Sequence, residues 1–130
     1  MKYVLYFVVL IILGCTKKSS DECPKNLACT EIFISIAVKI QKENQPSFKT
    51  EKIEVIFSDS GYRKPVVNDY NGMYSFVNDN DINNIQKSGT IIYIIGKDGL
   101  NHELFNEKYV IGHDCCHVIK LSGKDVITIN

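Results

Sequence analysis

Two histidines and two adjacent cysteines lie close together in residues 112–121, near the end of the chain. If this stretch is a strand, His113, Cys115 and His117 project from one face, because side chains alternate along a strand. Thiolates and imidazoles are ligands of zinc and copper, and His102 is available as a further ligand. The first chemistry that these residues suggest is therefore a metal site.

Disulfides are the competing chemistry for the same residues. Zinc-binding cysteines usually occur as spaced pairs, whereas Cys115 and Cys116 are direct neighbours. Bridges to Cys23 and Cys29 would account for four cysteines, and a metal would account for only two or three residues. We therefore favour two disulfides and no cofactor, and keep the metal site as the alternative.

Four cysteines allow three pairings. A bridge between the neighbours Cys115 and Cys116 is strained, and rejecting it also rejects its companion, Cys23 to Cys29. Both remaining pairings join the N-terminal segment to the C-terminal stretch, and the sequence does not choose between them. We expect Cys29 to make the tighter bridge, because Cys23 lies beyond Pro24 in a looser segment.

The N-terminus indicates the compartment. Residues 1–3 are positively charged, and the next ten, residues 4–13, carry no charge. Ten helical residues span about 15 Å, half of a hydrocarbon core, so this run is typical of a signal peptide rather than of a transmembrane helix. The sequence Ile12-Leu13-Gly14-Cys15 resembles the lipobox of bacterial lipoproteins, in which the cysteine is acylated with fatty acids such as palmitate.

Lipidation also explains the odd number of cysteines. Acylation of Cys15 leaves four of the five, which can close two disulfides with no free thiol. We thus predict a signal peptide at 1–14, a lipidated cysteine and tether at 15–28, and one domain at 29–130. Residues 19–22 resemble the acidic export signals of some Gram-negative surface lipoproteins, although a solvated linker explains them equally well.

Alternating apolar residues predict a β-rich domain. Residues 31–41 are the longest run, and one face of that strand is apolar and expected to point inward: Ile32, Ile34, Ile36, Val38 and Ile40. A second strand carries Ile53, Val55 and Phe57 inward. Further strands are expected at 73–77, 90–95, 103–111, 116–121 and 126–129.

Turn signals complete this prediction. Asn71-Gly72 is typical of a hairpin, and residues 90–95 read as a central strand covered on both faces. We expect a break in the strand at 103–111 near Asn106, and residues 116–129 as a closing hairpin. A helical turn around Ile82 and Ile85 would be capped by Asp79 or Asp81. These roughly seven short strands without a long helix predict an all-β fold, a single small antiparallel sandwich of immunoglobulin-like or transthyretin-like type.

Charge and motifs argue against several functions. The chain has 15 basic and 15 acidic residues with no sustained run of either sign, so nucleic-acid binding is not expected. Asp79, Asp81 and Asn83 alternate as calcium ligands do, but Asn84 and Thr90 stand where an EF-hand needs glycine and glutamate. A looser calcium site stays an alternative to a solvated loop.

No catalytic motif is present. Cys116 and His117 are adjacent, but strand neighbours point to opposite faces, and there is no serine elbow, zinc-protease helix or phosphate loop. We therefore expect no enzymatic activity. Tyr62, Tyr70 and Tyr74 could form a stacking platform for sugar rings or cap the end of the core.

Two segments resemble a known family. The order Cys-Thr-Glu-Ile-Phe at 29–33 and the motif Asp-Cys-Cys-His-Val at 114–118 resemble small bacterial lipoproteins of undefined function. The resemblance implies a transthyretin-like or carboxypeptidase-regulatory-like sandwich and brings no catalytic residues. We expect a lipid-anchored protein of the bacterial cell envelope, at the outer membrane, that binds an envelope protein or has a structural role. The alternatives are a carbohydrate-binding module and a metal-binding protein using His113, Cys115 and His117.

Overall fold

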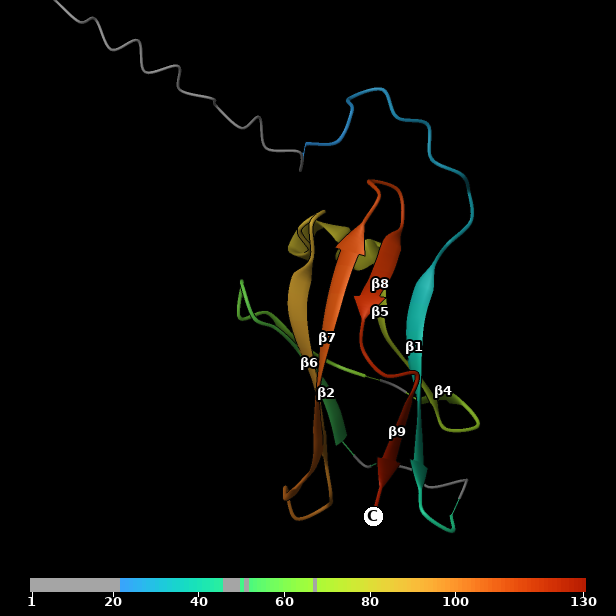
Figure 1. The fold of residues 1–130 in the computed structure, drawn as a ribbon, viewed down its shortest axis with the longest axis vertical. Helices are drawn as coiled ribbons and strands as arrows, with labels where there is room; N and C mark the ends of the chain where they lie inside the picture. Colours follow the sequence, from blue (N-terminus) through green and yellow to red (C-terminus); the bar gives the residue numbers. More distant parts are fainter. Residues whose placement is uncertain (1–21, 46–49, 51, 67) are drawn as a thin grey trace, which may run out of the picture.

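The chain folds into two packed β-sheets and one short 3-10 helix, as predicted for an all-β sandwich (Figure 1). The computed structural model describes residues 22–45, 50, 52–66 and 68–130. The elements within it are β1 (Ser35–Lys42), β2 (Lys52–Phe57), β3 (Arg63–Pro65), β4 (Asn68–Tyr70), β5 (Met73–Asn78), η1 (Asp79–Asn84), β6 (Thr90–Lys97), β7 (Glu103–His113), β8 (Val118–Ser122) and β9 (Val126–Ile129). The strand order is β4-β5-β1-β9 in the four-stranded sheet and β3-β2-β6-β7-β8 in the five-stranded sheet.

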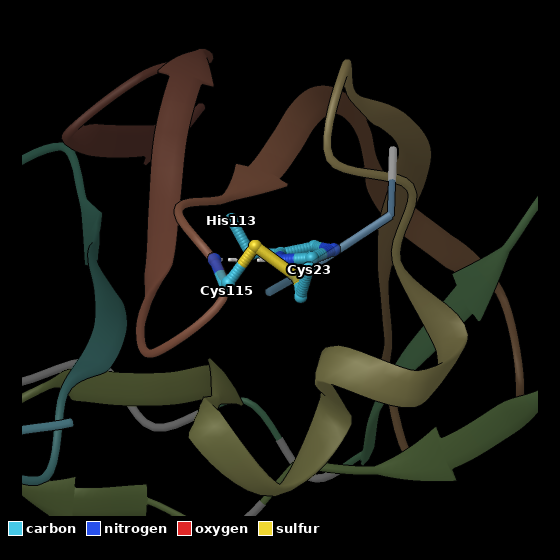
Figure 2. Close-up of side chains that lie close together, drawn as sticks. All are labelled: Cys23, His113 and Cys115. Atoms are coloured by element: carbon cyan, nitrogen blue, oxygen red, sulfur yellow. Dashed lines mark hydrogen bonds between the residues drawn. A yellow bond between two sulfur atoms is a disulfide. The ribbon is translucent and has the colours of Figure 1, made fainter. Parts of the chain in front are cut away.

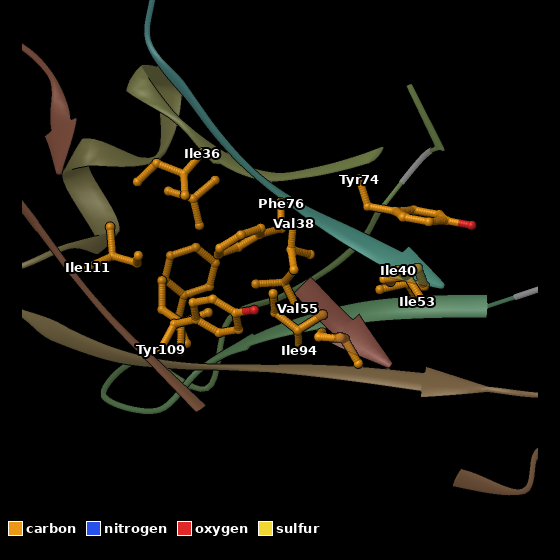
Figure 3. Close-up of a cluster of buried hydrophobic side chains, with 14 of the residues drawn as sticks. Ile36, Val38, Ile40, Ile53, Val55, Tyr74, Phe76, Ile94, Tyr109 and Ile111 are labelled. Carbon is orange, nitrogen blue, oxygen red and sulfur yellow. The ribbon is translucent and has the colours of Figure 1, made fainter. Parts of the chain in front are cut away.

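The core lies between the sheets (Figure 3). It is built from the inward-facing residues of strands whose side chains alternate between buried and exposed. Val38 and Ile40 of β1 and Val55 of β2 belong to this core, and all three side chains are fully buried. Phe76 and Tyr109, on opposite sheets, have ring centroids 4.8 Å apart and a tilt of 54°. Such tilted aromatic pairs contribute about 1 kcal/mol beyond the area they bury. Alternation therefore predicted the inward faces of β1 and β2 correctly.

The first strand is shorter than predicted. It begins at Ser35, which pairs with Asn78, and the preceding Ile32 is 64% exposed instead of inward. Its partner β5 ends at Asn78, where the chain turns into η1, so the residues before Ser35 have no strand to pair with. The prediction that Ile32 lies in the core was wrong for this reason.

The turn before β5 and the helical turn after it match the prediction, but the cap does not. Asn71 and Gly72 both have positive φ, as a tight hairpin requires. The cap of η1 is Asn78, whose side chain accepts a hydrogen bond from the backbone N–H of Asn80. Asp81 completes a capping box by accepting from the backbone N–H of Asn78 at 2.9 Å.

The central strands of the larger sheet differ in two details from the prediction. One face of β6 is buried, and the opposite face is only half-buried rather than covered. β7 runs without a break through Asn106, and the irregularity lies at Leu104, where the pairing with β6 shifts between Gly96 and Lys97. The polar Asn106 is tolerated because it points to the exposed outer face.

The last two strands do not form a hairpin. β8 pairs with β7 in the five-stranded sheet, whereas β9 crosses to the four-stranded sheet and runs parallel to β1. The domain is therefore not wholly antiparallel. Gly123, with φ of +130°, turns the chain between the sheets. Alternation in the sequence predicts that both segments are strands, but it does not predict their neighbours.

The N-terminal segment, blue in Figure 1, arches over the end of the sandwich that carries the β7–β8 turn. The predicted signal peptide at 1–14 and the predicted lipidation residue Cys15 lie outside the described residues. Residues 23–28 belong to the predicted tether. The disulfides of Cys23 and Cys29 nevertheless fix this part of the tether to the domain.

Candidate functional site

The β7–β8 turn is shaped by Asp114. Its carboxylate accepts hydrogen bonds from the backbone N–H of Cys116 at 2.9 Å and of His117 at 2.8 Å. The hydrogen bonds from His117 and then Cys116 lower the pKa of Asp114, since they favour its charged form. Cys115 adopts a φ of +84°, which is uncommon for a residue other than glycine. The turn therefore presents Cys115 and Cys116 in a geometry that a regular strand does not have.

Two disulfides join this turn to the N-terminal segment. Cys23 bonds to Cys115 and Cys29 bonds to Cys116, with Cα–Cα distances of 5.6 and 5.4 Å. This is one of the two pairings that the sequence left open, and neither a vicinal bridge nor a Cys23–Cys29 bridge forms. Each bridge spans most of the domain, with sequence separations of 92 and 87 residues. Two such bridges place the domain in an oxidising, extracytoplasmic compartment.

A chain of hydrogen bonds runs beside the second disulfide. His117 Nδ1 lies 2.8 Å from Asp79 Oδ2, and His117 Nε2 lies 2.9 Å from Thr30 Oγ1. The side chains of His117 and Asp79 are only 19% and 11% exposed. The three residues come from the β7–β8 turn, from η1 and from the N-terminal segment, so they join three elements at one point.

Asp79 is the centre of this network. Its two oxygens also accept hydrogen bonds from the backbone N–H of Ile34 at 2.8 Å and of Val118 at 2.9 Å. Burial raises the pKa of Asp79, but the hydrogen bonds from Ile34, His117 and Val118 outweigh burial and hold that pKa below its usual value. The ionised carboxylate is thus the stable form at neutral pH.

His113 lies on the other side of the turn, against the first disulfide. It is 8% exposed, and its Nδ1 accepts a hydrogen bond from the backbone N–H of Cys115 at 3.0 Å (Figure 2). Candidate ligand atoms of Cys23, His113 and Cys115 all lie within 4.8 Å of one another. The two sulfurs are bonded to each other in this form, so they are not available as thiolate ligands.

The predicted set of metal ligands is therefore divided. His113 and Cys115 lie together, whereas His117 is bound to Asp79 and Thr30 and is not part of the cluster. His102 lies in the β6–β7 loop, at the opposite end of β7, where it contacts Asp98 at 3.1 Å.

Of the three tyrosines considered for a sugar platform, Tyr74 follows the alternative prediction of a place in the core, and the side chain of Tyr70 lies outside what the structure describes. Tyr74 is only 2% exposed and its hydroxyl accepts from the backbone N–H of Thr50, so it belongs to the core rather than to a sugar platform. Tyr62 is 43% exposed and packs against Phe57. The carboxylate of Asp81 is buried against Lys64 and the cap of η1, so this residue is not part of a solvated loop.

A shallow pocket of about 420 Å³ lies over β2 and β3. Four cations contribute to its lining: Lys52, Arg63, Lys64 and Lys97. Arg63 pairs with Glu54 at 3.4 Å, and Lys64 pairs with Asp81. The pocket is therefore less cationic than its composition suggests, because part of its charge is already neutralised.

The sequence did not predict the roles of Thr30 and Asp79. The spacing from Asn78 to Asp81 is a capping signal that could have been recognised, since Asx residues cap helices. No local pattern indicates that Asp79 meets His117, which lies 38 residues further along the chain.

Comparison with known proteins identifies no relative: no family model, curated protein or solved structure matches this chain. Within residues 22–45, 50, 52–66 and 68–130, no helix is long and apolar enough to cross a membrane. The fold and the site together define a small extracytoplasmic β-sandwich whose N-terminal segment is bound to one end by two disulfides.

Proposed function

We propose that this protein is a lipid-anchored β-sandwich of the bacterial cell envelope, with a binding or structural role and no catalytic activity of its own. The two disulfides support export. The lipobox-like sequence ending at Cys15 supports an anchor, and the resemblance of residues 29–33 and 114–118 to small bacterial lipoproteins supports a place at the outer membrane. The two-sheet fold agrees with the transthyretin-like sandwich that this resemblance implies.

The observation that carries a binding role is an apolar patch on the outer face of the five-stranded sheet. We call it the outer patch, and it consists of Ile91, Val110, Ile119 and Leu121. Ile91 lies directly opposite Val110 in the sheet, and both are half-buried. Ile119 and Leu121 of the edge strand β8 are 41% and 52% exposed. Contiguous apolar surface of this kind is typical of an interaction site.

Two glycines allow the outer patch to be continuous. A β-carbon on Gly89 would lie 2.8 Å from Val110 Cγ1 and 3.1 Å from Leu121 Cδ1. A β-carbon on Gly112 would also lie 3.1 Å from Leu121 Cδ1. The Leu121 side chain thus lies over backbone that has no side chains of its own, and presents its other side to solvent.

The position of the outer patch indicates where a partner would lie. Gly112, beneath the patch, is three residues from Cys115, so the patch is at the disulfide-linked end of the sandwich. Cys23 is eight residues after Cys15, and eight extended residues span at most about 29 Å. A lipid on Cys15 would hold this end near the membrane, so we propose a membrane-associated envelope protein as the partner.

The anchor is tested by the substitution Cys15→Ser. We expect the variant to fold with both disulfides and to move from the membrane fraction to the soluble fraction, because one acylated cysteine supplies the attachment. Fractionation at high salt measures this. Retention of the variant in the membrane fraction would contradict the lipid anchor.

The outer patch is tested by placing a photo-cross-linking residue at position 91 in anchored protein in its native envelope. We expect a discrete protein adduct that Ile119→Asp abolishes, because a carboxylate in an apolar contact is strongly unfavourable. The control is Leu100→Asp, at a residue that is 77% exposed in the β6–β7 loop at the opposite end of the sheet. It should preserve the adduct, and neither substitution should change the melting temperature. An adduct that survives Ile119→Asp would exclude the outer patch as the binding surface.

A further inference from the structure

We propose that the reduced form of this protein binds one thiophilic divalent metal ion, such as zinc, through Cys23, His113 and Cys115. Their candidate ligand atoms already lie within 4.8 Å of one another (Figure 2). On a common tetrahedral zinc ion, two thiolate sulfurs lie roughly 3.8 Å apart. Small side-chain rotations are therefore sufficient to convert the cluster into a three-residue metal site. This inference does not depend on the proposed binding role.

The Cys23–Cys115 disulfide has to be reduced before a metal ion binds, because the thiolate is the ligand. A dithiol reductant supplies two electrons and two protons, and its own sulfurs become a disulfide while the S–S bond between Cys23 and Cys115 becomes two thiols. The metal ion then displaces both thiol protons into solvent. His113 adds a neutral imidazole, and water occupies the fourth position, as in open zinc sites.

His113 is the ligand that the fold positions in advance. It is the last residue of β7, is 8% exposed and pairs in the sheet with Val118. Its Nδ1 lone pair is occupied by the backbone N–H of Cys115. A neutral imidazole has a single free lone pair, so the ring has to give up this hydrogen bond to bind a metal ion through either nitrogen. Metal binding therefore requires reduction of the Cys23–Cys115 disulfide and release of this hydrogen bond, and the need for reduction makes the site redox-controlled.

The second disulfide does not offer an equivalent site. Within the described part of the chain, Cys23, His113 and Cys115 are the one group of three ligand side chains whose ligand atoms all come within 4.8 Å of one another. Cys29, Cys116 and His117 do not form such a group. The structure thus favours one metal ion per chain rather than two.

The experiment uses the full chain with Cys15→Ser, Cys29→Ser and Cys116→Ser, so that only Cys23 and Cys115 can be reduced. The protein is reduced with a phosphine, desalted without oxygen and titrated with zinc against a chromogenic chelator. Cobalt(II) in place of zinc reports thiolate ligation by its sulfur-to-metal charge-transfer band. We expect one ion per reduced chain and none per oxidised chain.

Matched variants identify the ligands. We expect His113→Gln and Cys23→Ser each to weaken zinc binding at least tenfold, whereas His102→Gln, at an exposed histidine at the other end of β7, leaves the affinity unchanged. If reduction unfolds the chain, zinc should restore the near-ultraviolet circular dichroism of the parent but not of His113→Gln, because metal binding is coupled to folding. Absence of binding by the reduced chain, equal affinity of His113→Gln, or failure of zinc to restore an unfolded chain would overturn the proposal.

Discussion

Asp79 and Asp98 have the same kinds of hydrogen-bond partner in different surroundings. Each carboxylate accepts from two backbone N–H groups and contacts a histidine Nδ1: Asp79 contacts His117 at 2.8 Å, and Asp98 contacts His102 at 3.1 Å. The partners of Asp98 all lie within its own loop, whereas those of Asp79 come from separate elements. Identical chemistry therefore has a local effect in one case and a global effect in the other.

This difference predicts the cost of removing each carboxylate. Asp79→Ala should lower the free energy of unfolding by about 3 kcal/mol, because it leaves the two partly buried backbone donors at Ile34 and Val118 without a partner. Asp98→Ala is the matched control and should leave the urea midpoint nearly unchanged. Equal effects of the two substitutions would show that Asp79 has no special role in joining the elements.

The pKa of Asp79 also predicts a dependence of stability on pH. The folded state holds this pKa below the unfolded value of about 3.9, so the ionised carboxylate stabilises the fold above that pH and the contribution is lost as the pH falls below it. Asp79→Asn should therefore destabilise the protein at pH 7 and reduce the further loss of stability between about pH 4 and pH 2. Urea unfolding of both proteins across this range measures the effect. Parallel curves would contradict it.

At the scale of elements, the crossover from β8 to β9 is what connects the two sheets at the C-terminus. Gly123 turns the chain there, and the Tyr109 hydroxyl donates a hydrogen bond to the backbone carbonyl of Lys124 at 2.9 Å. Burial, followed by the nearby charges of Glu107 and Asp125, raises the pKa of Tyr109, so the hydroxyl keeps its proton and remains a donor. The crossover is thus fixed by one glycine and one tyrosine.

A substitution at this crossover should be strongly destabilising. In Gly123→Ala, the new β-carbon would lie 2.0 Å from Tyr109 Cδ1, at a backbone φ of +130° that alanine rarely adopts. We expect a loss of about 3 kcal/mol from overpacking and backbone strain together. Gly61→Ala is the control, since Gly61 also has a positive φ but no atom within 4 Å of the new carbon, and it should cost about 1 kcal/mol. Similar costs at both positions would contradict the steric explanation.

At the scale of the whole molecule, the two disulfides join the same two segments, so their contributions to stability depend on each other. The first bridge to form closes a loop of almost ninety residues, which corresponds to about 4.6 kcal/mol in the chain-entropy model. The second bridge then closes only the short path through residues 23–29 and 115–116, which corresponds to roughly 2.4 kcal/mol. The bridges are therefore not expected to contribute additively.

These values predict how much unfolding free energy is lost when one or both disulfides are removed. Replacing either cysteine pair by serines should cost about 2 kcal/mol, and replacing both pairs should cost about 7 kcal/mol, more than the sum of the single effects. Loss of the Cys29–Cys116 bridge should cost somewhat more than loss of Cys23–Cys115, because Cys29 lies closer to β1 and next to Thr30, which contacts His117. Additive losses, or a larger cost for Cys23–Cys115, would contradict this account.

Local patterns in the sequence were sufficient to predict most of the secondary structure of the domain and its oxidising, extracytoplasmic compartment. The alternation at Val38, Ile40 and Val55 predicts buried faces because a strand has a period of two, and the even number of cysteines left after Cys15 predicts disulfides. The prediction failed at Ile32, where the apolar pattern continues but the neighbouring strand has ended.

The neighbours of each element were decided by the tertiary structure. The pairing of Cys23 with Cys115 depends on the positive φ of Cys115, which the hydrogen bonds of the turn hold, and the separation of β8 from β9 depends on how both sheets close over one core. The contact between Asp79 and His117 likewise exists only because η1 and the β7–β8 turn meet at one end of the sandwich. Periodicity records which side of a segment is buried, but not what lies against that side, because partners distant in sequence are selected by packing of the whole chain.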